Sequence, residues 1–400
     1  MEKLKNAPYL RFPDFNCEWE TKLLGEISKI NPTNKSLPEK FIYIDLESVE
    51  SGELMKEEVI YRDEAPSRAQ RILAKDDLIF QMVRPYQKNN FYFDKNGIYV
   101  ASTGYAQIRA RENSKYLYQY LHFQKFVDKV IERCTGTSYP SINSGDLSNI
   151  SISFPTLPEQ QKIANFLTSV DTKLTQLKQK KNLLEQYKKG VMQKIFSQEI
   201  RFKDDEGKEF PEWEVKKLGQ LAERMSRKNN ENNTNVLTIS AQQGLVSQLE
   251  FFNKSVSAKD VSGYYLLKKG GFAYNKSYSN GYPMGAIKCL KYYEKGVVST
   301  LYICFTFFES VDISFMEQYF ESGIHNKEIE SVAQEGARNH GLLNIGLSDF
   351  FNTEILIPCL KEQTKIANFL SSLDEKIKQC STQIEKTVQW KKGLLQQMFC

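Results

Sequence analysis

The amino-acid sequence predicts an α+β protein in which two mixed α/β domains alternate with two long helices. The first observation is an internal repeat: the segment PTLPEQQKIANFL from Pro155 recurs as PCLKEQTKIANFL from Pro358, an offset of 203 residues (358 − 155). Roughly half of the aligned positions are identical as far as Phe196 and Phe399, which indicates a duplication. The second observation is a helical apolar stripe in each copy, and the third is a series of strand-like runs before each copy.

The repeated segment is expected to be a long helix with coiled-coil character. Apolar residues step by four and three from Ile163 to Ile195, and the second copy keeps this register from Ile366 to Met398. About 38 residues at about 1.5 Å each give a helix of about 57 Å. Two such stripes in one chain would most simply bury each other. The length of chain between them favours an antiparallel pair, although a parallel pair is also compatible with a domain of that size.

The segments before the helices correspond more loosely. The motif WETKLLG at residues 19–25 recurs as WEVKKLG at residues 213–219. Runs such as Phe41–Ile44, Leu78–Val83 and Val297–Phe308 predict strands, and Asn-Gly turns separate them. The charged stretch Arg201–Glu209 is interpreted as a linker. The expected divisions are a domain at residues 1–155, a helix at 156–200, a domain at 201–357 and a helix at 358–400.

Composition limits the class of protein. An apolar content of 40% supports packed cores, while a net charge of +5 permits nucleic-acid binding without arguing for it. The seven cysteines are scattered and form no Cys-x-x-Cys pair, which argues against a disulfide framework or a zinc site and favours a reducing cytoplasm. With no run approaching 18 apolar residues, we expect no membrane span.

Catalytic signatures are mostly absent from the sequence. There is no phosphate-binding Gly-x-x-x-x-Gly-Lys-Ser/Thr motif and no Gly-x-Gly-x-x-Gly after a strand, and the three histidines lack metal-ligand spacing. Asp14, Glu20 and Lys22 resemble the acidic–lysine cluster of metal-dependent nucleases. These carboxylates lie too close in sequence for separate strands, and the second copy has Glu212 in place of the aspartate. We therefore expect no catalytic residue, metal or cofactor in this chain.

Two pairs of polar loops, one pair in each domain, are candidate DNA readers. They combine cations for phosphates, polar groups for base edges and tyrosines for stacking or sugar contacts, although ordinary polar turns remain the alternative. The candidates in the first domain are Arg84, Tyr86, Gln87, Lys88, Asn89, Thr137, Ser138, Tyr139 and Asn143. Those in the second domain are Lys276, Tyr278, Asn280, Tyr282, Arg338, Asn339 and His340.

A second set of candidates comes from the repeated helices and would contact a partner or DNA phosphates. They are present in both copies, and a solvated helix face is the alternative for the lysines. The set is Glu159, Gln160, Lys188 and Lys189 with Glu362, Gln363, Lys391 and Lys392. Gly190 and Gly393 follow the lysines. A glycine costs about 1 kcal/mol inside a helix, so we expect close helix approach or a helix end there.

The chain resembles the specificity subunit of a type I restriction–modification enzyme. The resemblance rests on the Arg84-Pro85-Tyr86 loop, the run GTSYPSIN at residues 136–143, the segment PEQQKIA at residues 158–164 and the WExKxLG motif that opens each half. It covers essentially the whole chain. The second half departs from it at residues 275–277 (NKS) and 336–338 (GAR), which puts one-to-one transfer of contacts in doubt.

The resemblance implies two target-recognition domains, each reading one half of a bipartite double-stranded DNA site. The helices would form an antiparallel coiled coil that spaces the domains and docks two methyltransferase subunits. Those subunits would hold S-adenosylmethionine and methylate adenine N6. Two restriction–translocation subunits, using ATP and magnesium, are a further implied partner. The alternatives are a stand-alone bivalent DNA-binding adaptor or regulator and, less favoured by the motifs, a methyltransferase or nuclease in one chain.

Overall fold

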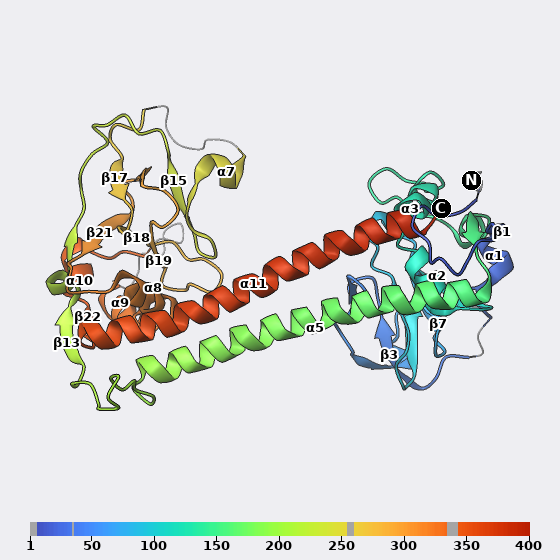
Figure 1. Ribbon diagram of the computed structural model, residues 1–400, viewed down its shortest axis with the longest axis horizontal. Coiled ribbons are helices and arrows are strands. Elements are labelled where there is room, and N and C mark those ends of the chain that lie inside the picture. Colours follow the sequence, from blue (N-terminus) through green and yellow to red (C-terminus); the bar gives the residue numbers. More distant parts are fainter. Residues whose placement is uncertain (1–5, 34–35, 254–259, 334–342) are drawn as a thin grey trace. The chain divides into compact units, whose positions relative to one another are not determined.

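The computed structural model describes residues 6–33, 36–253, 260–333 and 343–400. The chain divides into two compact units (Figure 1). Unit 1 comprises residues 1–179 and 381–400, and unit 2 comprises residues 180–380. Each unit therefore contains one α/β domain together with parts of both long helices.

The two long helices are α5 (Leu157–Phe196, 40 residues) and α11 (Leu360–Met398, 39 residues). The first part of α5 belongs to unit 1 with the last part of α11, whereas unit 2 contains the opposite ends. The helices therefore pair antiparallel, as the sequence predicted. Gly190 and Gly393 lie inside them, and a Cβ added at either glycine would meet no atom within 4 Å. Close helix approach is therefore wrong for these glycines, whereas the alternative of a nearby helix end fits, because α5 ends at Phe196 and α11 at Met398.

Unit 1 is built from small sheets and short helices. Strand β1 (Glu20–Leu23) pairs antiparallel with β12 (Ser151–Phe154). One four-stranded sheet has the order β2 (Ser28–Ile30), β11 (Tyr105–Ala110), β8 (Leu78–Gln81) and β9 (Phe91–Tyr92). The other has the order β6 (Val59–Tyr61), β3 (Lys40–Ile44), β10 (Tyr99–Ser102) and β7 (Ala69–Ile72), and β4 (Val49–Glu50) pairs with β5 (Glu53–Leu54). The helices are α1 (Leu24–Ile27), α2 (Ser114–Tyr120), α3 (Gln124–Ile131) and α4 (Ser144–Ser148), with 3-10 turns at Arg62–Glu64 and Pro85–Gln87.

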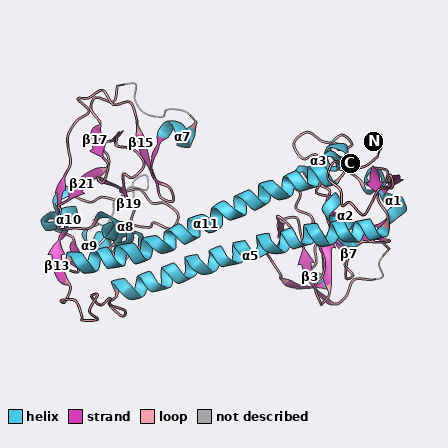
Figure 2. Cartoon of the chain, viewed as in Figure 1, coloured by secondary structure: helices cyan, strands magenta, loops and turns pink. Residues whose placement is uncertain are grey.

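Unit 2 repeats part of this frame. Strand β13 (Glu214–Lys217) pairs with β22 (Glu354–Ile357), and one sheet has the order β14 (Ala222–Arg224), β21 (Ile303–Phe307), β18 (Phe272–Asn275) and β19 (Ala286–Cys289). In place of the second four-stranded sheet it has two pairs, β15 (Leu237–Ser240) with β16 (Gly244–Ser247) and β17 (Tyr265–Lys268) with β20 (Lys295–Val298) (Figure 2). Its helices are α6 (Leu218–Leu221), α7 (Gln248–Phe252), α8 (Ile313–Glu321), α9 (Asn326–Val332) and α10 (Leu347–Asn352).

One strand expectation in unit 2 needs correction. The run Val297–Phe308 is divided between β20 and β21. A turn separates them, in which the N–H of Tyr302 donates to the carbonyl of Ser299 at 3.1 Å. The break follows the two polar residues Ser299 and Thr300 inside the run, where this turn forms.

The end of each long helix completes the core of one unit. Leu394, Met398 and Phe399 pack in the core of unit 1 beside the start of α5. Ile195 and Phe196 pack in the core of unit 2 beside the start of α11. Burial of large apolar side chains at about 25 cal/mol per Å² is the main stabilising contribution, so each domain folds around both helices.

Residues 201–209 are not a free linker. The guanidinium of Arg201 pairs with Glu362 of α11 at 3.0 Å, and the ring of Phe202 lies 5.6 Å from that of Phe369. Arg11 and Phe12 make the equivalent contacts with α5, to Glu159 at 2.7 Å and to Phe166 at 6.0 Å between ring centroids. The stretch is therefore the second copy of an anchoring arm whose charged composition resembled a linker.

Candidate nucleic-acid interface

The first candidate loop of unit 1 follows strand β8 and has an unusual backbone. Arg84 and Lys88 flank the 3-10 turn at Pro85–Gln87 with φ angles of 55° and 56°. Residues other than glycine seldom adopt this left-handed backbone conformation. It is retained in a folded protein where the surrounding structure imposes it. The N–H of Arg84 donates to the carbonyl of Pro140 at 2.8 Å. This bond places the loop beside the second candidate loop, at residues 136–143.

An aromatic and cationic surface results where these two loops meet. The guanidinium carbon of Arg84 lies 4.2 Å from the ring centroid of Tyr139, a cation–π distance. Tyr139 is 65% exposed and Tyr86 is 50% exposed. Thr137 and Ser138 are exposed beside them. The structure thus brings together five of the nine candidates of unit 1 with their functional groups at or near the surface.

Lys88 has a different environment from Arg84. Its Nζ donates to Oε1 of Gln124 at 2.8 Å and to the carbonyl of His122 at 3.1 Å. Burial, reinforced by the nearby charge of Lys392, lowers the pKa of Lys88. A lysine tied to two acceptors anchors the loop to the start of α3, so its position differs from that of an exposed phosphate contact.

The three remaining candidates of unit 1 also hold the loops in shape. Oε1 of Gln87 accepts from Gln81 at 2.8 Å, and Oδ1 of Asn89 accepts from the N–H of Ser51 at 3.1 Å. Asn143 is the N-cap of α4, where its Oδ1 accepts from the N–H of Asp146 at 2.8 Å. These contacts explain why the residue types fit the loops without any bound nucleic acid.

In unit 2 the corresponding loop follows β18, which occupies the place of β8 in the shared sheet order. Tyr278 is 66% exposed and Asn280 is also exposed. A tight turn closes the loop, with the N–H of Tyr282 donating to the carbonyl of Ser279 at 2.8 Å. The carbonyl of Lys276 accepts from the N–H of Leu343 at 3.1 Å. Arg338, Asn339 and His340 lie outside the described residues.

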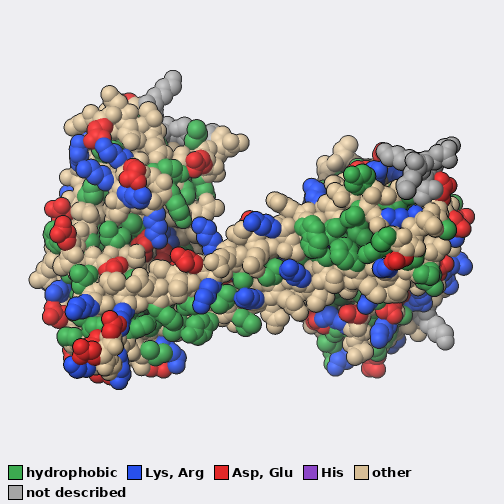
Figure 3. All heavy atoms as spheres, viewed as in Figure 1, with side chains coloured by type: hydrophobic (Ala, Val, Ile, Leu, Met, Phe, Trp, Pro, Cys, Tyr) green, Lys and Arg blue, Asp and Glu red, His purple; other side chains and the backbone are tan. Residues whose placement is uncertain are grey.

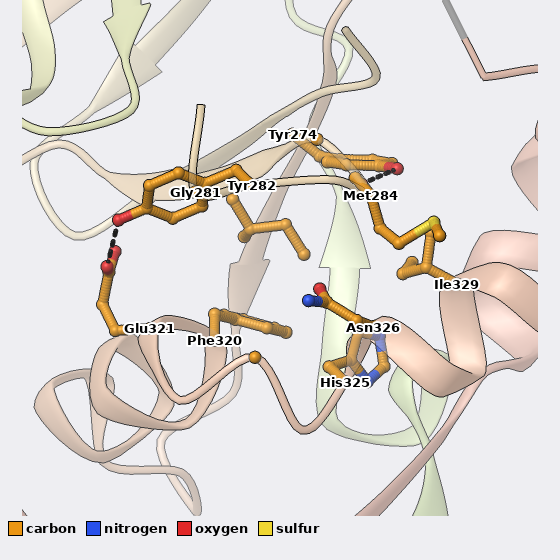
Figure 4. A pocket seen from close by; sticks show the side chains of 12 residues that line it. Tyr274, Gly281, Tyr282, Met284, Phe320, Glu321, His325, Asn326 and Ile329 are labelled. Carbon is orange, nitrogen blue, oxygen red and sulfur yellow. Dashed lines mark hydrogen bonds between the residues drawn. The ribbon is translucent and has the colours of Figure 1, made fainter. Parts of the chain in front are cut away.

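Tyr282 lines a pocket of about 140 Å³ between this loop and helices α8 and α9 (Figure 4). Its hydroxyl donates to Oε2 of Glu321 at 2.6 Å and accepts from Nζ of Lys288 at 3.0 Å. Burial, with the charge of Glu321 as the second cause, raises the pKa of Tyr282. The tyrosine is therefore half-buried, neutral and fixed in orientation.

On the opposite side of the pocket lie His325 and Asn326 (Figure 4). His325 is 2% exposed, and burial lowers its pKa to about 4. Its ring packs 5.4 Å from that of Phe320 between centroids. A neutral imidazole against an aromatic ring is the geometry of a core histidine, which agrees with the lack of metal-ligand spacing in the sequence.

The acidic and amide candidates on the long helices are not surface residues. Glu159, Gln160, Glu362 and Gln363 are all buried. Both carboxylate oxygens of Glu159 accept from Arg11, at 2.7 and 2.8 Å, and Oε2 of Glu362 accepts from Trp213 at 3.2 Å as well as from Arg201. The interpretation of these four residues as a partner surface is corrected: the chain's own fold encloses them.

The lysine candidates divide into two types. Lys188 pairs with Asp374 at 2.6 Å and Lys391 with Asp171 at 2.5 Å, each across the helix pair. Lys189 and Lys392 are exposed. Figure 3 shows lysine and arginine side chains along the helices on the face that it draws.

Sequence reasoning missed two exposed aromatic residues beside these lysines. Tyr187 is 55% exposed and Trp390 is 49% exposed. They are related by the repeat offset of 203 (390 − 187), which is the signal that could have found them. Tyr187 and Gly190, three residues apart, share a helix face, as do Trp390 and Gly393, whereas Lys189 and Lys392 lie on another side of the same turns. We call Tyr187 and Gly190 the patch of unit 2, and Trp390 and Gly393 the patch of unit 1.

The nuclease-like cluster is not assembled in the structure. Asp14 pairs with Lys162 of α5, whereas Lys22 pairs with Glu20 at 2.8 Å. Across the described ranges, no group of three or more His, Cys, Asp or Glu side chains is placed to hold a metal ion. Within the same ranges, no helix combines the length and apolarity that crossing a bilayer requires.

Comparison with known proteins identifies relatives of the whole arrangement. A family model described as the type I restriction modification DNA specificity domain matches residues 16–186 and again residues 211–389. The type I restriction enzyme MjaVIII specificity subunit of Methanocaldococcus jannaschii is 26% identical over 244 residues, covering 57% of this chain and 54% of the relative. The HindI specificity subunit of Haemophilus influenzae is 23% identical over 188 residues, 45% of this chain and 41% of the relative. The match thus spans about half the length of these curated relatives.

Solved structures show the same fold at low sequence identity. The S subunit of a type I restriction–modification system from M. genitalium has a TM-score of 0.58 at 16% identity, covering 98% of this chain and 99% of that one. A chain from a study of complex assembly and conformational transition of the type I system has a TM-score of 0.54 at 18% identity, covering 97% and 98%. The likeness extends over both units.

Proposed function

Since the chain belongs to the type I restriction–modification DNA specificity family, we propose that it is a non-catalytic specificity subunit that reads a bipartite DNA target. The observation that carries the proposal is the pair of loops that follow β8 and β18. The two strands hold equivalent places in the shared sheet order, but the loops carry different side chains. One frame with two different reading surfaces is what an asymmetric two-part target requires. The proposed divisions remain residues 1–155, 156–200, 201–357 and 358–400.

In unit 1 we assign reading of one half-site to Arg84 with Tyr86, Thr137, Ser138 and Tyr139. An arginine can donate two hydrogen bonds to O6 and N7 of guanine in the major groove. Stacking on Tyr139 fixes the plane of the guanidinium. Since its Nε is buried, the two terminal nitrogens would make these bonds. The hydrogen bonds within the chain that hold these loops in shape are made by the other four candidates, Gln87, Lys88, Asn89 and Asn143.

In unit 2 we assign the second half-site to Lys276, Tyr278 and Asn280, with Tyr282 as their anchored support. Asparagine can bond the N6 and N7 positions of adenine, and lysine can contact guanine or a phosphate. Tyr278 is exposed to a degree close to that of Tyr139, 66% against 65%. Arg338, Asn339 and His340 remain part of the proposal on their sequence alone.

We assign docking of two methyltransferase subunits to the two patches. Two equivalent patches, one in each unit, suit two copies of one partner. Each combines an exposed aromatic residue with a glycine that has open space above it, a composition that permits close approach of another helix, and an exposed lysine, Lys189 or Lys392, lies on another side of the same turn. The partners would supply S-adenosylmethionine and flip the adenine that they methylate at N6. Restriction–translocation subunits would add ATP and magnesium, and the assembly would work in the cytoplasm.

The proposal is tested by mapping methylated adenines genome-wide in cells that hold the partner subunits with and without this chain. We expect a bipartite motif that appears only when the chain is present. Tyr187→Ala with Trp390→Ala should abolish methylation, with Leu183→Ala, another exposed residue of α5, as the matched control. Because the ring of Trp390 lies 6.1 Å from that of Phe166, thermal unfolding of the double variant checks that its fold is retained. Specific binding by the chain alone, unaffected by the partner subunits, would instead indicate a stand-alone DNA-binding adaptor.

A further inference from the structure

Two equivalent clusters of a glutamine, an aspartate and a lysine join three elements in each unit. In unit 1, Nε2 of Gln119 donates to Asp171 at 2.7 Å, and Lys391 pairs with the same carboxylate at 2.5 Å. In unit 2, Nε2 of Gln318 donates to Asp374 at 2.8 Å, and Lys188 pairs with that carboxylate at 2.6 Å. We call these the clamp of unit 1 and the clamp of unit 2.

Each clamp connects a domain to both long helices. The glutamines lie on α2 and α8, helices of the two α/β domains. The aspartate comes from one long helix and the lysine from the other, with the roles of α5 and α11 exchanged between the units. Gln119 is 1% exposed and Gln318 is 5% exposed. In both units Nε2 of the buried glutamine is paired with the aspartate, while its Oε1 is buried without a hydrogen-bond partner. The same costly burial of an amide, found twice, indicates that its contact with the carboxylate is a specific feature of this arrangement.

The clamps define one register of the antiparallel helices. Seventeen residues separate Asp171 from Lys188 on α5 (188 − 171), and seventeen separate Asp374 from Lys391 on α11 (391 − 374). In an antiparallel pair this equality lets both ion pairs form in the same register. Sliding one helix by a single turn, about 5.4 Å, would break both pairs together.

Apolar packing between the clamps is discontinuous. Leu177 and Cys380 are buried there, but Leu174 and Leu184 are only half-buried, Leu183 is 57% exposed, and Lys181 interrupts the stripe. A short apolar seam tolerates slippage, whereas a few polar positions specify register in paired helices. The clamps therefore add polar determinants of register to an apolar seam that is discontinuous in its centre.

We propose that the two clamps are positioning devices that fix the helix register and thereby set the number of base pairs allowed between the half-sites. Gln119, Asp171, Lys391, Gln318, Asp374 and Lys188 are thus positioning residues that determine specificity without contacting DNA. This inference rests on the proposed function. It separates two properties of the target, because the reading loops select bases and the clamps select spacing.

The test uses the assembled methyltransferase complex and DNA duplexes that carry the mapped half-sites with spacers from two base pairs shorter to two longer than the native one. The variant is Asp171→Asn with Asp374→Asn, which keeps size and removes the charges. We expect the preference for the native spacer over its neighbours to fall about tenfold, since rigid joining is what confers the preference. The bases selected within each half-site should not change.

A charge exchange provides the complementary variant. Asp171→Lys with Lys391→Asp and Asp374→Lys with Lys188→Asp re-forms each ion pair in reverse, and the glutamine can turn its Oε1 toward the new lysine. This variant should recover spacer preference that the asparagine variant loses. The matched control is Lys181→Gln, because Lys181 pairs at 3.1 Å with Glu185 of its own helix and does not connect the helices.

The outcomes distinguish this inference from the proposed function. If wild-type complex shows no bipartite target, the proposed function fails. If it shows one, and the asparagine variant binds more weakly at every spacer with an unchanged ratio among them, the clamps only stabilise the fold and the inference is overturned. Should the asparagine variant not fold, Lys188→Met with Lys391→Met is measured in the same way, and the same unchanged ratio would overturn the inference.

Discussion

Units 1 and 2 have the same anchors and different loops, and the contrast separates structural from recognition roles. The arginine–glutamate pairs, the aromatic contacts of the anchoring arms and the Gln–Asp–Lys clamps occur in both units. The loops after β8 and β18 share a position in the sheet but no contact pattern. The anchors common to both units hold the frame, whereas the divergent loops are the surfaces to which we assign DNA reading.

The anchors themselves differ in one respect that can be measured. Arg11 is the partner of both carboxylate oxygens of Glu159, whereas Glu362 also accepts from the indole of Trp213 at 3.2 Å. Arg11→Met should therefore lower the free energy of unfolding of unit 1 by about 3–5 kcal/mol, because it leaves a buried carboxylate uncompensated. Arg201→Met should cost unit 2 less, since one donor to Glu362 remains.

Denaturant unfolding of the two variants measures this difference. Glu20→Gln is the control, because it removes an exposed ion pair with Lys22 and should cost less than about 1 kcal/mol. Equal losses for Arg11→Met and Arg201→Met would show that the indole contributes nothing to the anchor of unit 2.

Acid is expected to affect unit 2 through His325. Burial lowers the pKa of this histidine from its usual 6.5 to about 4, so the unfolded chain takes up the proton first as pH falls. Stability is therefore greatest above pH 6.5 and decreases toward pH 4, by roughly 3 kcal/mol at most for this residue. His325→Gln should flatten the dependence over this window. The free energy of unfolding is measured with urea at several pH values between 7 and 4. If it depends on pH equally in the wild type and in His325→Gln, the role assigned to His325 is contradicted.

The reading loops give the next largest effect. Arg84→Ala should weaken binding by about 1–3 kcal/mol and relax base preference in one half-site while leaving the other unchanged. Asn280→Ala should do the same for the opposite half-site. Competition binding with duplexes substituted in one half at a time measures both, with Lys40→Ala as a surface control distant from the loops in sequence. If either substitution removed base preference in both half-sites, the claim that each unit reads only one half-site would be wrong.

The two helix glycines give the smallest effect and the opposite sign. Because a Cβ at Gly190 or Gly393 meets nothing within 4 Å, alanine should stabilise the isolated chain by about 0.5–1 kcal/mol at each position. The same substitutions should weaken docking of methyltransferase subunits if these approach closely there. Thermal unfolding and a pull-down with the partner report the two effects separately. Stronger docking would exclude the glycines from the patches.

The sequence alone predicted the frame of the molecule well and its contacts less well. The repeat and the apolar stripes were sufficient for the two helices, whereas the length of chain between them favoured the antiparallel pairing without excluding a parallel one. Glu159 and Gln160 were misinterpreted because a residue shared by two copies can be buried or functional, and spacing does not distinguish these cases. The two cases are distinguished only by the residue that Glu159 contacts in the folded chain. That residue, Arg11, lies 148 positions away in the sequence.

Other features were hidden for related reasons. The anchoring arm at residues 201–209 is highly charged, so composition concealed that Arg201 and Phe202 pack against α11. The clamps combine common polar residues from three separate elements, a pattern that no local window contains. The sequence could identify the loops after β8 and β18 as polar, but it could not distinguish the Arg84–Tyr139 contact at the surface from the internal hydrogen bonds of Lys88 and Asn143.

The central claim is that each unit reads its own half of the target on a shared frame. The most direct measurement exchanges residues 20–154, from β1 to β12, for the equivalent segment of another specificity subunit and maps methylated adenines in cells with the partner subunits. The account predicts a motif in which one half changes while the other half and the spacer are retained. A motif altered in both halves, or altered in neither, would contradict it.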